Sequence, residues 1–224
     1  DKILYMKKIE AVLFDLDGTL IDTERFTILS KVEGGKEFGY DISYEDAKKT
    51  LGLARPNSDA FMRSKYGENV PTEYFRKKRR QMIFDELKAK GLILKKGTKE
   101  IIDYLNNENI KKAICTSTYS KIIDEYRNYS DLFDKFDVLI TGDMVEKGKP
   151  NPDIFLKASK VLNVPVENCL VVEDANSGIE AAINGGFNTV MIPDLVNIDS
   201  QFLDKVEIFA SLLDVIDFIK SING

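Results

Sequence analysis

Two aspartates spaced by one residue follow a short apolar run near the start of the chain. The run is Ala11–Phe14, and Asp15, Leu16, Asp17 and Gly18 come directly after it. Four consecutive apolar residues are typical of a strand buried on both faces of a parallel sheet. In extended backbone Asp15 and Asp17 project to the same side. Two carboxylates crowded at the end of a buried strand are destabilising unless a cation compensates them, so this pattern indicates a metal and chemistry.

An exposed acidic turn and a calcium loop are the other interpretations of this segment. The calcium-loop template would place its third ligand at Thr19 and its glycine at Leu20, so that template fails. An exposed turn stays open on this segment alone, because Asp-Gly pairs commonly form turns.

The composition is that of an ordinary globular protein, with 43% hydrophobic and 31% charged residues among 224. A net charge of −5 does not favour nucleic acid or an anionic membrane as a partner. Cys115 and Cys169 lie in apolar runs, which indicates buried thiols in a reducing compartment, the cytoplasm. The chain has no histidine, so acid/base chemistry must depend on carboxylates, lysines or tyrosines.

The beginning of the chain and its apolar runs give no sign of a targeting or membrane segment. The first ten residues lack the apolar core of a secretory signal, and no apolar run is long enough to cross a bilayer. Met6, followed by two lysines, is a candidate for the natural start of the chain.

Short apolar runs alternate with amphipathic segments through most of the sequence. Besides Ala11–Phe14, strands are predicted at residues 113–115, 138–140, 170–172 and 189–192. Helices are predicted at 98–107, 120–128, 152–162, 177–184 and 212–222. This alternation predicts right-handed βαβ units and an α/β fold with a Rossmann-like open parallel sheet. Ligands of such sheets bind beyond the carboxyl ends of the strands.

Residues 22–91 interrupt the alternation and carry only helical patterns, at 26–38, 44–51, 58–66 and 72–87. We predict that they form an inserted all-α cap domain, while residues 1–21 and 92–224 form the catalytic core. The basic run at 75–80 is interpreted as a solvated helix face, because apolar side chains supply the opposite side. A cation of this run that reaches a substrate phosphate is the alternative.

Three hydroxyl side chains, those of Thr116, Ser117 and Thr118, stand between a predicted strand and a predicted helix. Hydroxyls and free amides at a helix N-terminus can bind phosphate. Serine and threonine are also ordinary N-cap residues, so both interpretations stay open on this segment alone.

Two later segments add a lysine and a second acidic pair. Lys149 lies beside Pro150 and close to Pro152, which stiffen the backbone that presents it. Glu173 and Asp174 end another buried run and repeat the crowding of Asp15 and Asp17. One hard cation that prefers oxygen ligands would compensate both pairs, and Mg²⁺ with several retained waters suits a site of few carboxylates. The predicted metal site comprises Asp15, Asp17, Glu173 and Asp174.

These segments resemble, in order, the four motifs of the haloacid dehalogenase (HAD) superfamily. The strings are DLDGTLIDTE at 15–24, ICTSTYSK at 114–121, GKPNPDIF at 148–155 and VVEDANSGIEAA at 171–182. The resemblance covers nearly the whole chain and implies phosphoryl transfer through an aspartyl phosphate. It implies that Asp15 is the nucleophile and Asp17 the general acid/base, and that Lys149 is a catalytic cation that also binds the phosphate by neutralising the charge of the nucleophile and the phosphoryl group.

The resemblance also implies the binding residues. Thr116 with the adjacent Ser117 would bind the phosphate, and Asp174 would bind the metal, with Glu173 as a second ligand directly or through water. The expected contribution of Asp17 to the metal is its backbone carbonyl.

The position of the helical insert resembles the branch with an α-helical cap, which includes β-phosphoglucomutases and many small phosphatases. The segment LGLARPN resembles the substrate loop of that branch through Gly52 and Arg55, which implies that Arg55 contacts a sugar phosphate. The mutases are expected to carry a hinge histidine where this chain has Thr27. This difference favours a phosphatase acting on a small phosphomonoester over a mutase, which stays the alternative.

Two other classes fit the sequence less well. A phospho-acceptor receiver also uses aspartate, Mg²⁺, lysine and threonine, but its acceptor lies on a mid-chain strand and it has no helical insert. A dehalogenase would need neither Asp17 nor the metal-binding acids. The expected partner is therefore a small phosphorylated metabolite, with no nucleic acid and no membrane, and the expected state is a monomer or weak dimer.

Overall fold

The structure is a computed structural model that describes residues 7–224, so Met6, the candidate start, lies outside the described residues. A six-stranded parallel sheet has the strand order β3-β2-β1-β4-β5-β6. The strands are β1 (Ala11–Phe14), β2 (Lys111–Cys115), β3 (Val138–Ile140), β4 (Cys169–Glu173), β5 (Asn188–Met191) and β6 (Glu207–Ile208). The predicted α/β fold with a parallel sheet is confirmed.

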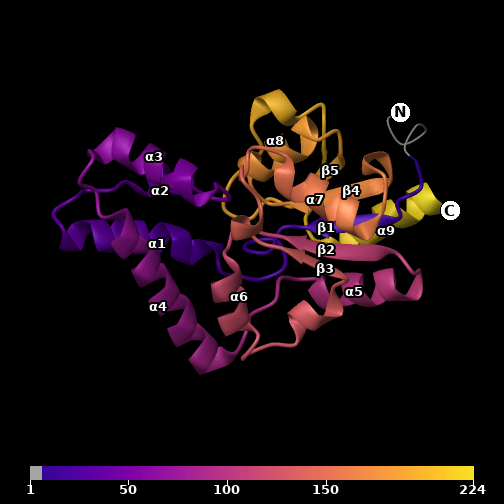
Figure 1. Ribbon diagram of the computed structural model, residues 1–224, viewed down its shortest axis with the longest axis horizontal. Coiled ribbons are helices and arrows are strands. Elements are labelled where there is room, and N and C mark those ends of the chain that lie inside the picture. The colour runs from indigo at the N-terminus through magenta and orange to yellow at the C-terminus, as the bar shows by residue number, and fades with distance from the viewer. Residues whose placement is uncertain (1–6) are drawn as a thin grey trace.

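The central position of β1 explains its continuous apolar run. Figure 1 shows α7 (Asp153–Leu162) and α8 (Asn176–Asn184) on one side of the sheet and α5 (Thr98–Asn107) on the other. Alternate residues of β1 belong to different clusters, Ala11 and Leu13 on one face and Val12 and Phe14 on the other. A strand covered on both faces must be apolar throughout.

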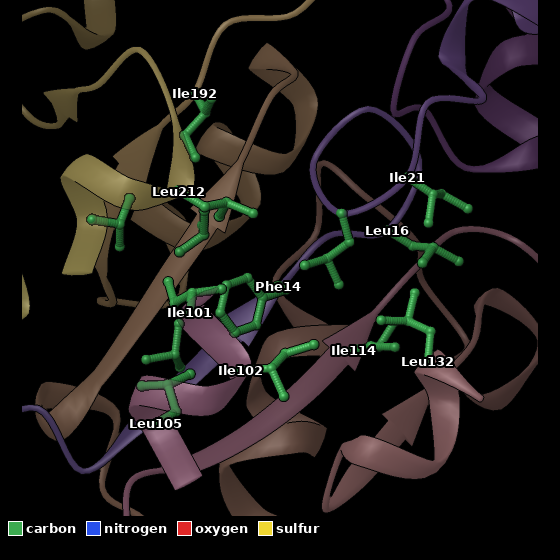
Figure 2. Packing of buried hydrophobic residues seen from close by; sticks show 14 of the residues in the cluster. Phe14, Leu16, Ile21, Ile101, Ile102, Leu105, Ile114, Leu132, Ile192 and Leu212 are labelled. Carbon is green, nitrogen blue, oxygen red and sulfur yellow. The ribbon is translucent and has the colours of Figure 1, made fainter. Parts of the chain in front are cut away.

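The cluster that contains Phe14 is the larger one. Ile101, Ile102 and Leu105 of α5 pack there with Leu212 of α9 (Leu212–Asn223), as Figure 2 shows. The opposite cluster contains Ile154 and Phe155 of α7 and Ala181 and Ala182 of α8. Helix α6 (Ser120–Tyr126) follows β2 and contributes Ile123 and Tyr126 to the larger cluster.

Four further helices lie between β1 and α5, to one side of the sheet (Figure 1). They are α1 (Glu24–Glu37), α2 (Tyr44–Lys48), α3 (Arg55–Tyr66) and α4 (Thr72–Lys90), which we call the cap helices. They have a separate apolar cluster that includes Ile28, Ile42, Met62 and Phe75. The division into a core and a cap domain at residues 22–91 stays a prediction.

The predicted elements correspond closely to the observed ones, with differences at the ends. Helix α3 begins at Arg55 rather than at 58, because proline is tolerated in a first helical turn and Pro56 stands there. Strand β6 was not predicted, since it has two residues and only one of its edges is paired. Single 3₁₀ turns lie at Leu132–Lys135, Gly142–Met144, Val166–Asn168 and Ser200–Phe202. No helix within residues 7–224 has the length and apolar character needed to cross a membrane.

The central strand should dominate the stability of the sheet. We expect Phe14→Ala to lower the free energy of unfolding by about 3–5 kcal/mol, because Phe14 is completely buried and its loss leaves a cavity. Phe38→Ala is the matched control, since Phe38 is 52% exposed, and should cost less than about 1 kcal/mol. Urea denaturation measures both values, and equal losses would contradict this account of the core.

Candidate active site

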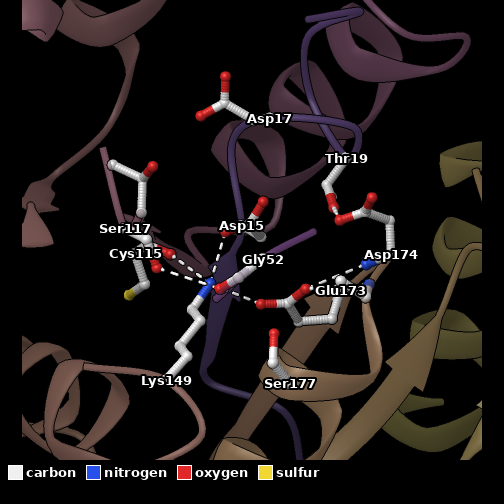
Figure 3. A network of polar contacts seen from close by, with 12 residues as sticks. Asp15, Asp17, Thr19, Gly52, Cys115, Ser117, Lys149, Glu173, Asp174 and Ser177 are labelled. Carbon is white, nitrogen blue, oxygen red and sulfur yellow. Dashed lines mark hydrogen bonds and ion pairs between the residues drawn. The ribbon is translucent and has the colours of Figure 1, made fainter. Parts of the chain in front are cut away.

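A lysine lies completely buried among carboxylates at the carboxyl ends of the central strands (Figure 3). The Nζ atom of Lys149 donates to Asp15 Oδ1 at 2.5 Å, to Glu173 Oε1 at 2.6 Å and to the Cys115 carbonyl at 3.1 Å. Burial opposes its charge, but the two carboxylates outweigh burial and raise the pKa of Lys149. The ammonium group therefore stays charged.

The strand register brings these groups together from distant parts of the sequence. Phe14 lies beside Ile114 on β2 and beside Val172 on β4, so Asp15 and Glu173 reach the same edge of the sheet. Lys149 comes from the loop before α7, as the proline-flanked motif predicts.

Three carboxylates, those of Asp15, Glu173 and Asp174, offer oxygen atoms that all lie within 4.8 Å of one another. Burial above all, and then repulsion between the carboxylates, raises the pKa of Asp174. Burial also raises the pKa of Asp15 against the lowering effect of Lys149. One ammonium group faces three carboxylates, so the cluster lacks positive charge.

The unused oxygens of the cluster suit a divalent cation. Asp174 Oδ2 is buried and has no hydrogen-bond partner among the described residues, whereas Oδ1 accepts from Thr19 at 3.2 Å. Glu173 Oε2 accepts from the backbone N–H groups of Asp174 and Ala175 at 3.1 and 3.4 Å. Gly18 approaches so closely that a Cβ atom there would stand 2.3 Å from Asp174 Oδ2. A hard cation that binds carboxylate oxygen fits this donor set.

The carboxylate of Asp17 lies apart from this cluster and points away from Lys149 (Figure 3). Its Oδ1 accepts from Thr23 at 2.5 Å and from Arg79 at 2.9 Å, and its Oδ2 accepts from Thr118 at 2.8 Å. These hydrogen bonds engage both oxygens of the carboxylate. The contribution of Asp17 to a metal that is still available is the predicted one of its backbone carbonyl.

The hydroxyl residues after β2 lie in a loop rather than on a helix, because α6 begins only at Ser120. The Thr118 N–H donates to the hydroxyl of Thr116 at 3.0 Å. The Ser117 hydroxyl donates to the carbonyl of Gly52 at 3.3 Å, so this loop contacts the segment between α2 and α3.

A pocket of about 150 Å³, which we call the active-site pocket, lies between the sheet edge and the cap helices. Asp15, Asp17, Thr116 and Ser117 line it, whereas Lys149 lies beneath Asp15. Arg55 lines it from the cap, and its guanidinium group stacks on the Tyr119 ring at 3.8 Å from the ring centroid. Five predicted residues therefore line one cavity, whereas Lys149, Glu173 and Asp174 do not line it and lie next to it around Asp15.

The interpretation of the basic run as a solvated face is wrong for Arg76 and Arg79. Three arginines of the run, Arg76, Arg79 and the exposed Arg80, line the active-site pocket, and Arg79 pairs with Asp17. The sequence spacing could have indicated the inward position of Arg79. This residue stands four residues after Phe75 and four before Ile83, both of which are buried. Residues four apart share one face of a helix, so this arginine belongs to the buried face of α4.

Glu24 is a pocket residue that the sequence interpretation missed. It is buried in the first turn of α1, where the Gly52 N–H donates to its Oε1 at 3.3 Å. Burial raises the pKa of Glu24, while Arg79 lowers it. Acidic residues are ordinary in a first helical turn, so the sequence held no distinctive signal for this role.

The family comparison agrees with this geometry. The sequence model described as "haloacid dehalogenase-like hydrolase" matches residues 12–192, which include all four motifs. The chain belongs to this family. The prediction of an enzyme of the HAD hydrolase family is therefore confirmed.

Several relatives of this HAD hydrolase carry phosphatase names. The phosphorylated carbohydrates phosphatase of Thermotoga maritima is 30% identical over 184 residues, which cover 81% of this chain and 83% of that protein. The (DL)-glycerol-3-phosphatase 2 of Arabidopsis thaliana is 32% identical over 217 residues, which cover 91% of this chain and 87% of that protein.

Solved structures share the fold. CbbY from Rhodobacter sphaeroides in complex with phosphate has a TM-score of 0.77 and 24% identity, over 92% of this chain and 96% of that one. The β-phosphoglucomutase of Clostridium difficile has a TM-score of 0.78 and 23% identity, over 96% of this chain and 97% of that one. The Rossmann-like core with inserted helices is therefore the architecture of known HAD structures.

The crowded carboxylates predict an unusual response to mutation. In buffer without divalent cations, we expect Asp174→Asn to raise Tm by about 2–4 °C, because the amide removes one of three mutually repelling buried charges. Adding Mg²⁺ should raise the Tm of the parent protein but leave that of Asp174→Asn unchanged.

Asp204→Asn is the control, since Asp204 is exposed, and it should behave like the parent in both buffers. Differential scanning calorimetry measures the four values. A lower Tm for Asp174→Asn together with an undiminished response to Mg²⁺ would contradict the metal site.

Proposed function

We propose that this HAD hydrolase is a Mg²⁺-dependent phosphatase that acts on a small phosphomonoester, a sugar phosphate or similar metabolite, through an aspartyl phosphate on Asp15. The observation that carries the proposal is the buried ion pair between Lys149 and Asp15, the latter of which lines the active-site pocket. Relatives named for phosphorylated carbohydrates and glycerol 3-phosphate support this substrate class.

Asp15 suits the role of nucleophile. Lys149 binds its Oδ1, which leaves Oδ2 to attack phosphorus, and the ammonium charge opposes the rise in pKa that burial causes. Asp15 and Asp174 would hold Mg²⁺ directly, with Glu173 through water and the Asp17 carbonyl as a further ligand. When bound there, Mg²⁺ supplies the positive charge that offsets the phosphoryl oxygens.

Asp17 suits the role of acid/base because it faces the pocket outside the carboxylate cluster. As the carboxylic acid it would protonate the leaving alkoxide oxygen, and as the carboxylate it would take a proton from the water that attacks the aspartyl phosphate. Contacts from Thr23, Thr118 and Arg79 fix its orientation.

The remaining predicted residues bind and enclose the substrate. Thr116 and Ser117 would contact the transferred phosphoryl group, and Arg55 would contact the rest of the substrate from the cap. The hydrogen bond from Ser117 to the Gly52 carbonyl would hold the cap closed over the phosphate end of the pocket. Such closure excludes water until a substrate is in place.

The mutase alternative loses support at the hinge position. The hydroxyl of Thr27 donates to Glu24 Oε2 at 2.9 Å, so it is engaged within the first turns of α1. Threonine carries no positive charge, and its single hydroxyl cannot replace an imidazolium group as a controller of the acid/base. Transfer of the phosphoryl group to water is therefore favoured over transfer to a sugar.

The nucleophile assignment predicts a severe and selective defect. We expect Asp15→Asn to lower kcat by about a thousandfold or more, on the order of 4 kcal/mol of transition-state stabilisation, because the amide cannot attack phosphorus. Release of phosphate from p-nitrophenyl phosphate measures the rate, and circular dichroism checks the fold. Asp204→Asn is the control, and activity of Asp15→Asn within tenfold of it would refute the assignment.

Hydrolysis and mutase activity can be separated in one assay. We expect the enzyme incubated with β-glucose 1-phosphate, Mg²⁺ and a catalytic amount of glucose 1,6-bisphosphate to release inorganic phosphate steadily. Glucose 6-phosphate and phosphate are measured together over time. Glucose 6-phosphate that accumulates well ahead of phosphate would establish the mutase instead.

A further inference from the structure

A second, smaller cavity lies inside the cap, between α1, α3 and α4. Its volume is about 40 Å³, and we call it the inner compartment. Four of its lining residues, Ser58, Asp59, Arg76 and Arg79, also line the active-site pocket, so the two cavities adjoin. Lys31 of α1 lines only the inner compartment.

Positive charge exceeds negative charge around the inner compartment. Lys31, Arg76 and Arg79 line it, whereas Asp59 is the one carboxylate among the residues of 7–224 that form its wall. Arg76 pairs with Asp59 at 2.5 Å and also with Glu73, which lies outside this wall. Arg79 directs one terminal nitrogen to Asp17 on the side of the active-site pocket.

Lys31 is a buried ammonium group without an anionic partner. It is 8% exposed, and its Nζ donates to the backbone carbonyl of Thr27 at 3.3 Å. Within residues 7–224, no carboxylate oxygen lies within 4.0 Å of it. Burial, and then repulsion from Arg79, lowers the pKa of Lys31 to about 8, although Glu24 and Asp59 act in the opposite direction. A buried charge without a partner of opposite sign lowers the free energy of unfolding, so Lys31 is unfavourable for stability at this position.

The neighbouring arginines also have unused donors. The Nε atoms of Arg76 and Arg79 are buried and have no hydrogen-bond partner in the described part of the chain. Buried polar atoms are normally hydrogen-bonded, so two unsatisfied arginine donors beside a buried ammonium group without a carboxylate partner indicate an anionic ligand.

The size and place of the inner compartment restrict that ligand. Because a single water needs about 10–15 Å³, the cavity has room for about three small atoms, which suits a carboxylate better than a phosphate. A Cβ atom at Gly18 would stand 3.2 Å from Glu24 Cγ and 2.3 Å from Asp174 Oδ2, so Glu24 lies near the carboxylate cluster. Lys31 lies seven residues farther along α1. At 1.5 Å per residue this is about 10 Å, roughly the length of an acyclic five- or six-carbon chain with its phosphate.

We propose that the substrate carries a carboxylate at the end opposite its phosphate, and that Lys31, with Arg76 and Arg79, binds this carboxylate in the inner compartment. The substrate class is then a phosphorylated sugar acid of five or six carbons. This inference rests on the proposed phosphatase function, and it assigns the specificity for the distal end of the substrate to the cap.

A matched pair of compounds tests the carboxylate directly. 6-Phosphogluconate and sorbitol 6-phosphate share one six-carbon chain and differ only in a carboxylate against a hydroxymethyl group at the distal end. We expect 6-phosphogluconate to inhibit p-nitrophenyl phosphate hydrolysis competitively with an inhibition constant at least about tenfold lower than that of sorbitol 6-phosphate. Competition is measured whether or not either compound is itself hydrolysed.

Lys31→Met is the informative variant, because methionine fills a similar volume without charge. We expect the tenfold preference to fall to about one, and Tm to stay equal or rise because an unpaired buried charge is removed. Lys36→Met on the same helix is the control, since Lys36 is exposed, and it should keep the preference.

Several results would overturn the proposal. These are equal inhibition by the two compounds in the parent, no competition by 6-phosphogluconate, or a preference that persists in Lys31→Met. Fructose 1,6-bisphosphate carries a phosphate where the proposal places a carboxylate. If it inhibits more strongly than 6-phosphogluconate, and Lys31→Met abolishes that difference, the group bound in the inner compartment is a second phosphate and not a carboxylate. A parent enzyme that releases no phosphate from p-nitrophenyl phosphate would instead refute the phosphatase function.

Discussion

The crowding of carboxylates around the buried ammonium group of Lys149 is the constraint on which the rest of the structure depends. Asp15, Glu173 and Asp174 meet there because neighbouring parallel strands end at the same edge, and burial raises the pKa of Asp15 and of Asp174. An arrangement so unfavourable by itself persists only where the surrounding structure determines it. The two apolar layers that cover β1 supply that rigidity.

The cap meets the core at the same lysine. While the Nζ of Lys149 binds Asp15, its backbone carbonyl accepts from the Ala54 N–H at 3.3 Å and from the Asn57 side chain at 3.1 Å. The segment that positions the proposed catalytic cation thus also contacts the cap helices. Arg79 of α4 makes a second connection, through its ion pair with Asp17. Asp17 thus contacts a cap helix directly, and Asp15 is connected to the cap helices through Lys149.

The sequence alone predicts the parts of this site that depend on local pattern. Asp15 and Asp174 directly follow buried strands, and the prolines beside Lys149 distinguish it from Lys147, so short segments suffice to find them. Strand register, by contrast, is a tertiary property, and so is the choice of which charged residues of a helix face inward. Glu24 and Lys31 have no local signature, because their roles follow from how α1 packs against α4 and not from their own neighbours.

Arg79 shows what a chain without histidine requires. Its position between Phe75 and Ile83 on the buried face of α4 would favour an apolar residue, yet the guanidinium group reaches Asp17 at 2.9 Å. A histidine in contact with an acid/base would lose its charge near neutral pH, whereas arginine stays charged throughout. The orientation of Asp17 is therefore set by the fixed charge of Arg79 and by the hydroxyls of Thr23 and Thr118.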